Sequence, residues 1–522
     1  MRHLTGAGWR RGGLAVLAAA ALAVTTAACS FDDDGGSGDG DGGERAQVLR
    51  VGVQGLPPGQ GNPFSALGSP SIYTWSALFD ALTLVDATGE VTGALATEWT
   101  NTSDTSWRFT LRDGVTFSNG EPFDADAVVA TFDYLHSEEG QDTTVGQELT
   151  GIESASATSA TEVEFTTSEP DPILPARLSS MYIVAPQAWA ELGPEGFATE
   201  PVGTGSYQVQ AWQPGEATLV GYEQSWRPAQ TPELTVVELA EPASRLQALA
   251  SGQLDMAVGL APDQASQVES AGGTVEVNPA PQVMSLAFIT TDPDAPLSDP
   301  RVRQALNYAV NKDAIVENLL GGLAKPAGQG ATPVAFGQNP DVAPYPYQPE
   351  TATSLLTDAG YGDGLELTAD VVVGSFPADG QIYQAMAADL AAVGVDLTLN
   401  EVDFPTWLEK YLGGTWDTDT FGLSWNTAPT LDASRPYSLF SCDKQPPFFC
   451  DESVMPLHEQ AATEFDPAAR RAILQNLAVA VHENPPALYL VEQVDLNALA
   501  EGVSGYRNDN RTIAYHEMTA PA

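Results

Sequence analysis

Apolar and polar side chains alternate in the stretch WRFTLRDGVTF. Trp107, Phe109 and Leu111 fall on one face of an extended chain, because successive side chains of a strand point to opposite faces. Asp113 and Gly114 are typical turn residues, and the alternation resumes after them. We therefore predict two antiparallel strands that are joined by this turn.

A helical period follows in residues 124–135, where apolar side chains recur three and four positions apart. Asp124 can cap the first turn, because its carboxylate can accept a backbone N–H. The segment 297–322 repeats this period over two shorter helices, and Asn311 can cap the second of them. These segments are the clearest predicted helices.

Beyond residue 201, short apolar runs alternate with helical patterns, which is typical of parallel strands with right-handed crossovers. Two such α/β units, with a β-rich insertion near the N-terminus, predict two lobes and a cleft. Ligands in such folds bind beyond the carboxyl ends of the strands, between the domains. The predicted strands are 234–239, 255–260, 365–373, 395–403, 419–425 and 486–493.

The stretch PVGTGSY (201–207) looks like the start of a phosphate-binding loop. Such a loop needs more glycine and usually a Lys-Ser/Thr pair at a helix start, so that successive N–H groups surround the anion. Here Tyr207 and Val209 begin a strand-like alternation instead. We interpret Gly203 and Gly205 as residues of a tight turn at a domain boundary.

Residues 1–28 have the layout of a secretory signal, with basic residues, an apolar run and small residues before Cys29. Small residues before a cysteine also resemble a bacterial lipobox, in which the cysteine is lipidated. Two acyl chains suffice for stable anchoring. The acidic, glycine-rich residues 29–46 predict a flexible tether. We expect an extracytoplasmic protein that Cys29 anchors to the cell membrane; the alternative is secretion without this anchor.

The chain of 522 residues is strongly acidic, with 69 Asp and Glu, 21 Lys and Arg and a net charge of -48. This excess excludes nucleic acid as the expected partner, because phosphate binding needs basic patches. The length allows two or three domains.

Two cysteines lie close together in SCDKQPPFFC. Outside the cell, such a pair usually forms a disulfide, so we predict a bond between Cys442 and Cys450. Zinc is the competing interpretation, but it needs more than two cysteines, and the five histidines are scattered. We therefore expect no metal site.

Several motifs, taken together, resemble the extracytoplasmic solute-binding proteins of ABC importers, specifically the peptide/nickel type (solute-binding family 5, with the oligopeptide- and dipeptide-binding proteins). The resemblance covers nearly the whole mature chain. The motifs occur in the family's order: FTLRDGVTFSNGEPFDADAVVATFDY (109–134), PVGTGSY (201–207), ALASGQLDMA (248–257), DPRVRQALNYAVNKDAIV (299–316) and SLLTDAGY (354–361).

This resemblance implies a periplasmic-binding-protein-like (type II) α/β fold. Two α/β lobes close around a ligand by a hinge, and a smaller α+β domain is inserted in the first lobe. The implied boundaries are 47–82, 201–287 and 496–522 for lobe I, 83–200 for the inserted domain and 288–495 for lobe II.

In peptide-binding relatives, the pocket uses the loop after the first strand and the loop after a strand that ends in tryptophan. A tryptophan in the helix before that strand is a further candidate wall. For each tryptophan, packing in the core is the alternative. The implied ligand contacts are Ser69, Ser71, Tyr73, Trp407, Trp425, Asn426 and Thr427.

One position departs from the peptide-binding pattern. These relatives often carry an aspartate three residues after the tryptophan, where it binds the ligand's α-ammonium. Ala428 stands there in this chain, and Asp432 is the candidate substitute. Blocked peptides, sugars and other small molecules therefore become candidate ligands. Nickel alone is disfavoured without a histidine cluster, whereas a metal chelate stays among the candidates.

The resemblance implies a receptor that captures a peptide or another small solute and delivers it to an ABC permease. We expect a monomer that needs no cofactor and is not an enzyme. One alternative is a lipoprotein of the same fold that acts in envelope regulation or signalling. The other is a secreted hydrolase with paired carboxylates, although the sequence lacks the common hydrolase motifs.

Overall fold

Residues 48–521 are the part of the chain that the computed structural model describes. The predicted signal segment 1–28, the tether 29–46 and Cys29 lie outside these residues. Among the helices of the described part, none is both long and apolar enough to span a bilayer.

The first strand, β1 (Val48–Val53), lies within a sheet of eleven strands. It pairs in parallel with β10 (Glu233–Glu238) on one side and β11 (Met256–Leu260) on the other. β9 (Glu216–Gly221) and β8 (Tyr207–Gln213) extend the sheet in antiparallel fashion. We call the part of the chain that is packed on these five strands lobe I.

Lobe II is the part that is packed on β14 (Leu365–Val371), β15 (Val395–Glu401) and β16 (Thr420–Asn426). β14 pairs in parallel with both neighbours, as the alternation of strands and helices predicted. The helices of lobe II include α9 (Pro300–Ala309), α10 (Lys312–Leu319), α11 (Pro349–Asp358), α12 (Asp379–Ala392) and α13 (Phe404–Gly413).

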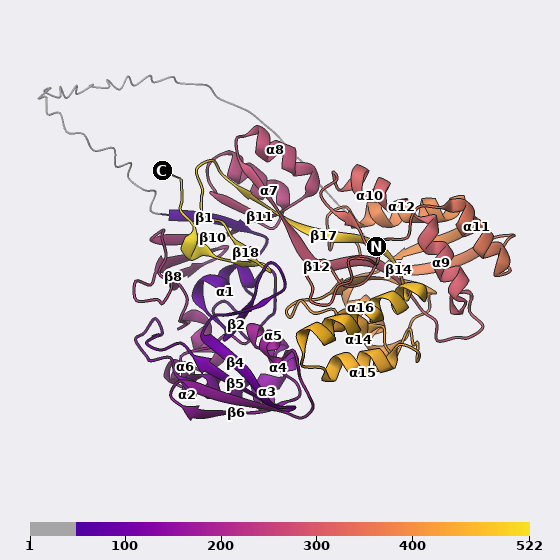
Figure 1. Cartoon of the computed structure of the whole chain (residues 1–522). Helices are drawn as coiled ribbons and strands as arrows, with labels where there is room; N and C mark the ends of the chain where they lie inside the picture. Colours follow the sequence, from indigo (N-terminus) through magenta and orange to yellow (C-terminus); the bar gives the residue numbers. More distant parts are fainter. Residues whose placement is uncertain (1–47, 522) are drawn as a thin grey trace, which may run out of the picture. The chain divides into compact units, whose positions relative to one another are not determined.

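Two long antiparallel strands, β12 (Thr274–Phe288) and β17 (Ala487–Leu499), run through both lobes (Figure 1). β17 pairs with β11 of lobe I, and β12 pairs with β16 of lobe II. Their mutual register shifts between Pro279 and Val283, at the passage from one lobe to the other. These strands connect the lobes and form the hinge.

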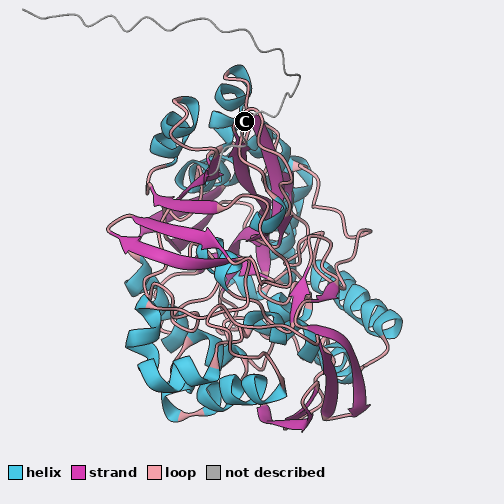
Figure 2. Ribbon diagram, turned by 90° about the vertical axis from the view of Figure 1, so that its left-hand side faces the viewer, coloured by secondary structure: helices cyan, strands magenta, loops and turns pink. Residues whose placement is uncertain are grey.

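A smaller sheet of four antiparallel strands lies apart from the large one (Figure 2). Its order is β4 (Ala96–Ser103), β5 (Ser106–Leu111), β7 (Glu162–Thr167) and β6 (Ile152–Ser159). The predicted hairpin is therefore wrong in its pairing, because β5 pairs with β4 and β7 and not with the segment after Gly114. Alternation identifies a strand but not its partner.

The predicted helix caps are confirmed. α2 (Ala125–His136) begins after Asp124, whose Oδ1 accepts the Ala127 N–H at 3.1 Å. Asn311 caps α10 in the same way, with its Oδ1 3.1 Å from the Ala314 nitrogen. The other helices are α1 (Ile72–Leu78), α3 (Glu138–Gln141), α4 (Thr144–Glu148), α5 (Leu174–Arg177), α6 (Pro186–Thr199), α7 (Pro242–Ala250), α8 (Ala265–Ser270), α14 (Ser434–Leu439), α15 (Met455–Thr463) and α16 (Pro467–Glu483).

The remaining elements are short. They are the strands β2 (Thr83–Val85), β3 (Val91–Gly93), β13 (Lys325–Pro326), β18 (Asn508–Asp509) and β19 (Thr512–Ile513), and the 3-10 helices Leu178–Ser180, Pro262–Gln264, Pro296–Ser298 and Tyr515–Glu517.

The glycines of PVGTGSY have another role than the predicted tight turn. Neither Gly203 nor Gly205 has a positive φ. A Cβ at either position would collide with the backbone at the end of α1, around Leu78. Thr204 between them donates its hydroxyl to the buried Asp80 carboxylate at 2.8 Å. The two positions therefore require glycine because the backbone of this stretch lies directly against the backbone at the end of α1.

Candidate functional site

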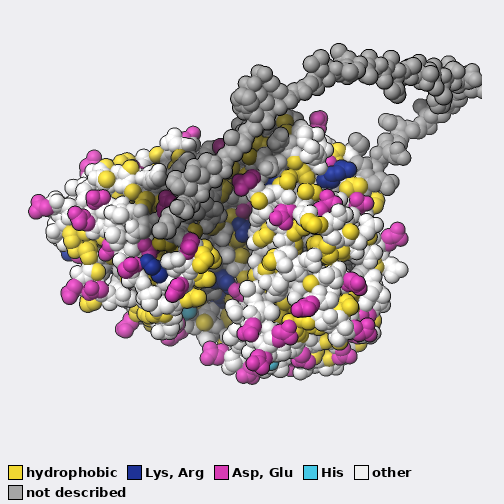
Figure 3. Space-filling view, turned by 180° about the vertical axis from the view of Figure 1, so that it is seen from behind, with side chains coloured by type: hydrophobic (Ala, Val, Ile, Leu, Met, Phe, Trp, Pro, Cys, Tyr) yellow, Lys and Arg dark blue, Asp and Glu magenta, His cyan; other side chains and the backbone are white. Residues whose placement is uncertain are grey.

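A cavity of about 660 Å³ lies against the hinge strands, with residues of both lobes in its walls. We call it the hinge cavity. Gln282 of β12 and Gln493 and Asp495 of β17 line it from the hinge. Figure 3 shows a hollow on one face of the molecule, in which Lys and Arg side chains are visible, whereas Asp and Glu side chains are scattered over the outer surface.

Lobe I contributes the loops that follow neighbouring parallel strands. Gln54 follows β1, Glu241 follows β10 and Pro262 follows β11, and all three line the hinge cavity. This is the edge at which α/β sheets bind ligands. The buried Arg245 donates to the carbonyls of Leu239, Ala240 and Gly259 at 2.5, 2.9 and 2.6 Å, so it holds two of these loops together.

Lobe II contributes residues 374–377, which follow β14. The buried Asp379 at the start of α12 accepts the backbone N–H groups of Gly374, Ser375 and Phe376 at 3.0, 2.9 and 3.0 Å. The same carboxylate also accepts the Gly380 N–H at 2.7 Å, and these four backbone hydrogen bonds fix the shape of this wall before a ligand arrives.

A second cavity of about 280 Å³ adjoins the first, and we call it the loop cavity. Residues 66–69 line it from lobe I, and Asn426, Ala428 and Pro429 line it from lobe II. The two cavities share Ser69, Gln282 and Arg511 in their linings, which therefore form a common wall.

Arg511 reaches this wall from the tip of the β18–β19 hairpin. Asn510 and Arg511 have φ values of 48° and 70°, the positive values that a two-residue hairpin turn requires. The Arg511 guanidinium donates to Asp495 at 2.6 and 3.0 Å, and to Gln282 Oε1 at 3.1 Å. The ion pair is largely buried, with side-chain exposures of 16% and 20%. It places opposite charges side by side in the cleft.

Two side-chain amides of the hinge cavity keep a polar atom without a hydrogen bond. Gln54 Oε1 and Gln493 Nε2 are buried atoms with no partner in the described chain. A buried polar atom without a partner costs free energy. The side chains themselves line the cavity, and each amide group carries a donor and an acceptor, so this wall suits a ligand that has both an N–H and a C=O group, such as an amide.

Three of the predicted ligand contacts lie in the cavity walls. Ser69 lines both cavities and accepts a hydrogen bond from Gln54 Nε2 at 2.5 Å. Tyr73 lines the hinge cavity, and burial raises the pKa of its phenol well above the usual range, so the group is neutral. Asn426 lines the loop cavity.

The other predicted contacts lie outside both cavities. Trp425 packs in the core of lobe II, and the half-buried Trp407 packs against this core. Their indole N–H groups donate to Ser285 Oγ at 2.7 Å and to Gly422 O at 3.0 Å. The buried Thr427 donates to the Pro281 carbonyl, also within the protein. Ser71 is the buried residue directly before α1, and it lines neither cavity.

Asp432 also lines neither of the two cavities. Its carboxylate accepts two hydrogen bonds from Arg470, at 2.6 and 2.9 Å, and two from the backbone and hydroxyl of Ser434. Both side chains of the ion pair are almost fully buried. All of this carboxylate's hydrogen bonds serve the packing of α14 against α16.

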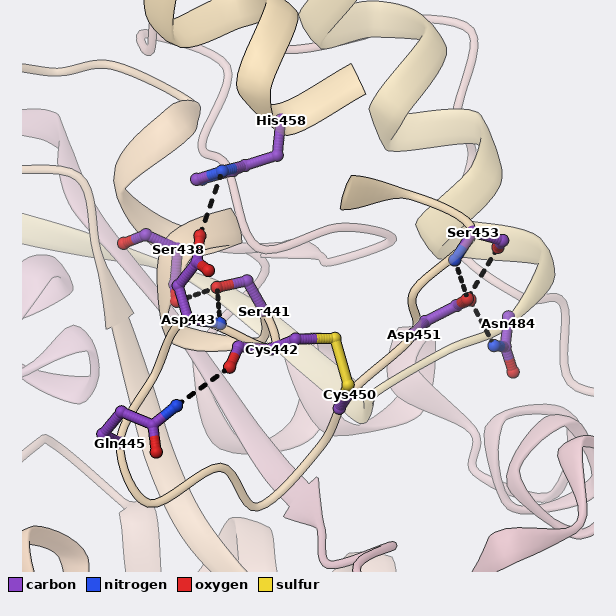
Figure 4. The surroundings of a disulfide bond; sticks show 10 residues. All are labelled: Ser438, Ser441, Cys442, Asp443, Gln445, Cys450, Asp451, Ser453, His458 and Asn484. Carbon is purple, nitrogen blue, oxygen red and sulfur yellow. Dashed lines mark hydrogen bonds and ion pairs between the residues drawn. A yellow bond between two sulfur atoms is a disulfide. The ribbon is translucent and has the colours of Figure 1, made fainter. Parts of the chain in front are cut away.

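A disulfide joins Cys442 and Cys450, whose Cα atoms are 4.5 Å apart (Figure 4). The Ser441 hydroxyl accepts the Asp443 N–H beside it. The bond closes a short loop of lobe II and lies apart from the residues that line the two cavities. Within residues 48–521, no group of three or more His, Cys, Asp or Glu side chains is arranged to hold a metal ion.

Sequence reasoning missed the charged wall of Arg511 and Asp495. The signal for Asp495 was weak: Glu492, Gln493 and Asp495 interrupt an otherwise apolar strand. For Arg511 the signal was the turn-forming run NDN that precedes it. Neither pattern indicates that the two residues meet in the cleft.

Two lobes, a hinge and a cleft between them define a ligand-binding protein. A family profile described as "Bacterial extracellular solute-binding proteins, family 5 Middle" matches residues 90–446, and the chain belongs to this family. Its members are solute receptors of ABC importers and not enzymes, so the chain is an extracytoplasmic solute-binding protein.

Relatives and solved structures agree with this assignment. The glutathione-binding protein GsiB of Escherichia coli (strain K12) is 25% identical over 469 residues, which cover 85% of this chain and 89% of GsiB. The unliganded open form of the periplasmic murein tripeptide binding protein MppA matches with a TM-score of 0.78 and 21% identity, over 92% of this chain and 98% of MppA. DppA from Helicobacter pylori, in complex with the peptide STSA, matches with a TM-score of 0.72 and 20% identity, over 91% and 98%. The two structures show the fold, which is that of the type II periplasmic binding proteins predicted from the sequence.

Proposed function

We propose that this receptor binds a short peptide or a peptide-like amide in the hinge and loop cavities and delivers it to an ABC permease. The observation that carries the ligand class is the set of side-chain amides in the walls of the hinge cavity, which belong to Gln54, Gln282 and Gln493. A peptide group carries both an N–H donor and a C=O acceptor, which are the partners that a side-chain amide can bind.

The charged wall supports the same ligand class. Asp495 and Arg511 present a carboxylate and a guanidinium at the junction of the two cavities. A zwitterionic peptide carries complementary charges, which these side chains can bind by charge-assisted hydrogen bonds. The volumes of about 660 and 280 Å³ suit a small ligand, since such sites occupy about 300–1,000 Å³. The names of GsiB, MppA and DppA point to peptides as well.

Calorimetry with a panel of probes tests this proposal. The panel contains glutathione, di- to hexa-alanine, N-acetylated trialanine, a disaccharide and nickel–histidine. We expect saturable 1:1 binding of at least one free peptide and at least tenfold weaker binding of the sugar and the chelate. Binding of the sugar or the chelate, with none of the peptides bound, would contradict the ligand class.

The anchor and the permease complete the proposal. We infer that the mature chain begins with a diacylated Cys29, that residues 29–46 tether it to the membrane, and that it acts as a monomer. The predicted domains, with lobe I discontinuous around the inserted residues 83–200, would let the lobes close by the hinge. Mass spectrometry of the mature N-terminus checks the lipid, and an unmodified cysteine would contradict the anchor.

A further inference from the structure

The loop cavity ends at an ion pair that spans the cleft. Arg435 in α14 of lobe II donates through both of its Nη atoms to the two carboxylate oxygens of Glu148, at 2.7 Å each. Glu148 is the last residue of α4, in the region between β5 and β6 of the small sheet. The two residues are 287 positions apart, so only the tertiary structure brings them together.

A third cavity of about 300 Å³, the outer cavity, lies on the other side of this ion pair. Glu148 and Arg435 line both the loop cavity and the outer cavity, and they therefore separate the two. A fourth cavity of about 320 Å³ shares Pro172, Ile173 and Thr430 with the outer cavity. The hollow space between lobe II and the rest of the chain thus continues well beyond the ion pair.

The backbone on each side of the ion pair is held firmly. Arg177 donates to the Glu148 carbonyl at 3.1 and 2.7 Å and is itself paired with Asp171 at 2.5 Å. On the lobe II side, the Arg435 N–H donates to the carbonyl of Asp432, which forms the buried ion pair with Arg470. The backbones are fixed, and the barrier between the cavities consists of two side chains.

The two side chains themselves remain movable. Their exposures are 35% for Arg435 and 21% for Glu148, so water reaches the ion pair. Such partly exposed pairs contribute little to stability, because solvent screens them and ordering two long side chains costs entropy. A ligand that gains contacts beyond the pair can therefore displace it.

We propose that the Glu148–Arg435 pair is the end wall that sets the length of the ligand. This inference rests on the proposed peptide ligand. With the pair formed, a ligand is confined to the hinge and loop cavities. A longer peptide has to break the pair, and its additional residues then enter the outer cavity.

Calorimetry with the alanine ladder, from dialanine to hexa-alanine, tests the wall. The wild type is compared with the double variant Glu148→Ala/Arg435→Ala and with Glu148→Gln/Arg435→Gln, which keeps the volume and removes the charges. The matched control is Arg108→Ala/Glu164→Ala, because this exposed ion pair of the small sheet lines none of the four cavities. Melting curves check that each variant is folded.

We expect the wild type and the control to lose at least tenfold in affinity at one step of the ladder. In the double alanine variant this step should move to peptides at least one residue longer. An identical length profile in all four proteins would overturn the end wall.

A ligand-independent measurement separates this inference from the proposed ligand class. Ala428→Cys places a thiol in the loop cavity, in a chain that also carries Cys29→Ser. We expect a bulky biotin-maleimide to label it at least tenfold faster in the double alanine variant than in the parent, and equal rates would overturn the wall. If none of the alanine peptides and glutathione binds the wild type, the peptide proposal fails and the labelling rates alone decide on the wall.

Discussion

The two cavities of the cleft differ in how their walls are built. The hinge cavity is bounded by loops that follow parallel strands, and these loops are held by Arg245 and Asp379 through backbone hydrogen bonds. The loop cavity is less than half as large and is bounded by irregular segments around Ser69 and Ala428 and by the Glu148–Arg435 pair. The difference suggests that the hinge cavity provides a preformed site, whereas the loop cavity selects ligands by size and charge.

Removal of Arg511 should have the largest effect on peptide affinity, because its side chain is part of the wall that both cavities share. Arg511→Ala removes the largely buried guanidinium that we propose binds a carboxylate of the peptide, and truncating one partner of a buried charge pair across a binding interface costs about 2–5 kcal/mol, or roughly 30-fold or more in affinity. Calorimetry with the tightest-binding peptide measures this loss. Arg108→Ala is the control, and a loss of the same size in the control would remove Arg511 from the site.

A carboxylate at position 428 should affect the loop cavity alone. Ala428 lines this cavity at the position where peptide-binding relatives often carry aspartate. Ala428→Asp should favour a free tripeptide over its N-acetylated form by about tenfold, because a charge-assisted hydrogen bond to the ammonium is added. Competition binding compares the two peptides, with Ala428→Asn as the uncharged control. An unchanged preference would mean that the ligand's amine lies elsewhere, for example at Asp495.

The stability of the fold should depend on pH through Glu492 in the hinge strand β17. Burial raises the pKa of this carboxyl to about 7, while Lys325 opposes the shift. The folded chain therefore keeps a proton between pH 4.5 and 7 that the unfolded chain has lost, and stability falls as pH rises through this window. The full shift corresponds to about 3 kcal/mol, which solvent around this partly exposed group reduces to about 1 kcal/mol.

Melting curves at pH 5 and pH 8 measure this effect. Glu492→Gln should reduce the difference in melting temperature between pH 5 and pH 8. At pH 8 the variant should melt at a higher temperature than the wild type. The same pH dependence in the variant and the wild type would assign the effect to other groups.

The smallest effect is expected at Ser71, which lies near the cavities but lines neither of them. Ser71→Ala should change peptide affinity by less than about twofold, because its buried hydroxyl has no hydrogen-bond partner in the described chain. Ser69→Ala should weaken binding several-fold, since Ser69 lines both cavities. Equal effects of the two substitutions, measured by calorimetry, would contradict this assignment of the walls.

The sequence was informative about the loop cavity and silent about most of the hinge cavity. Ser69 and Asn426 follow recognisable strands and motifs, so their position at the cleft could be predicted. Gln282, Gln493 and Asp495 lie on strands that continue through both lobes, and their polar side chains carry no motif. Trp407 and Trp425 show the opposite error, since aromatic residues near a site are as often core residues.

What the sequence determined by itself is local. Residues 124–135 and 297–322 form capped helices, and the apolar runs form strands, because side-chain periodicity and backbone capping act over only a few residues. The ordered motifs also determined the family.

The tertiary structure alone decided the pairings. It gave β5 partners other than the segment after Gly114, and it carried β12 and β17 through both lobes. It also brought Arg511 to Asp495 and Arg435 to Glu148. These contacts join residues that are distant in the chain, and no local period encodes which distant surfaces meet.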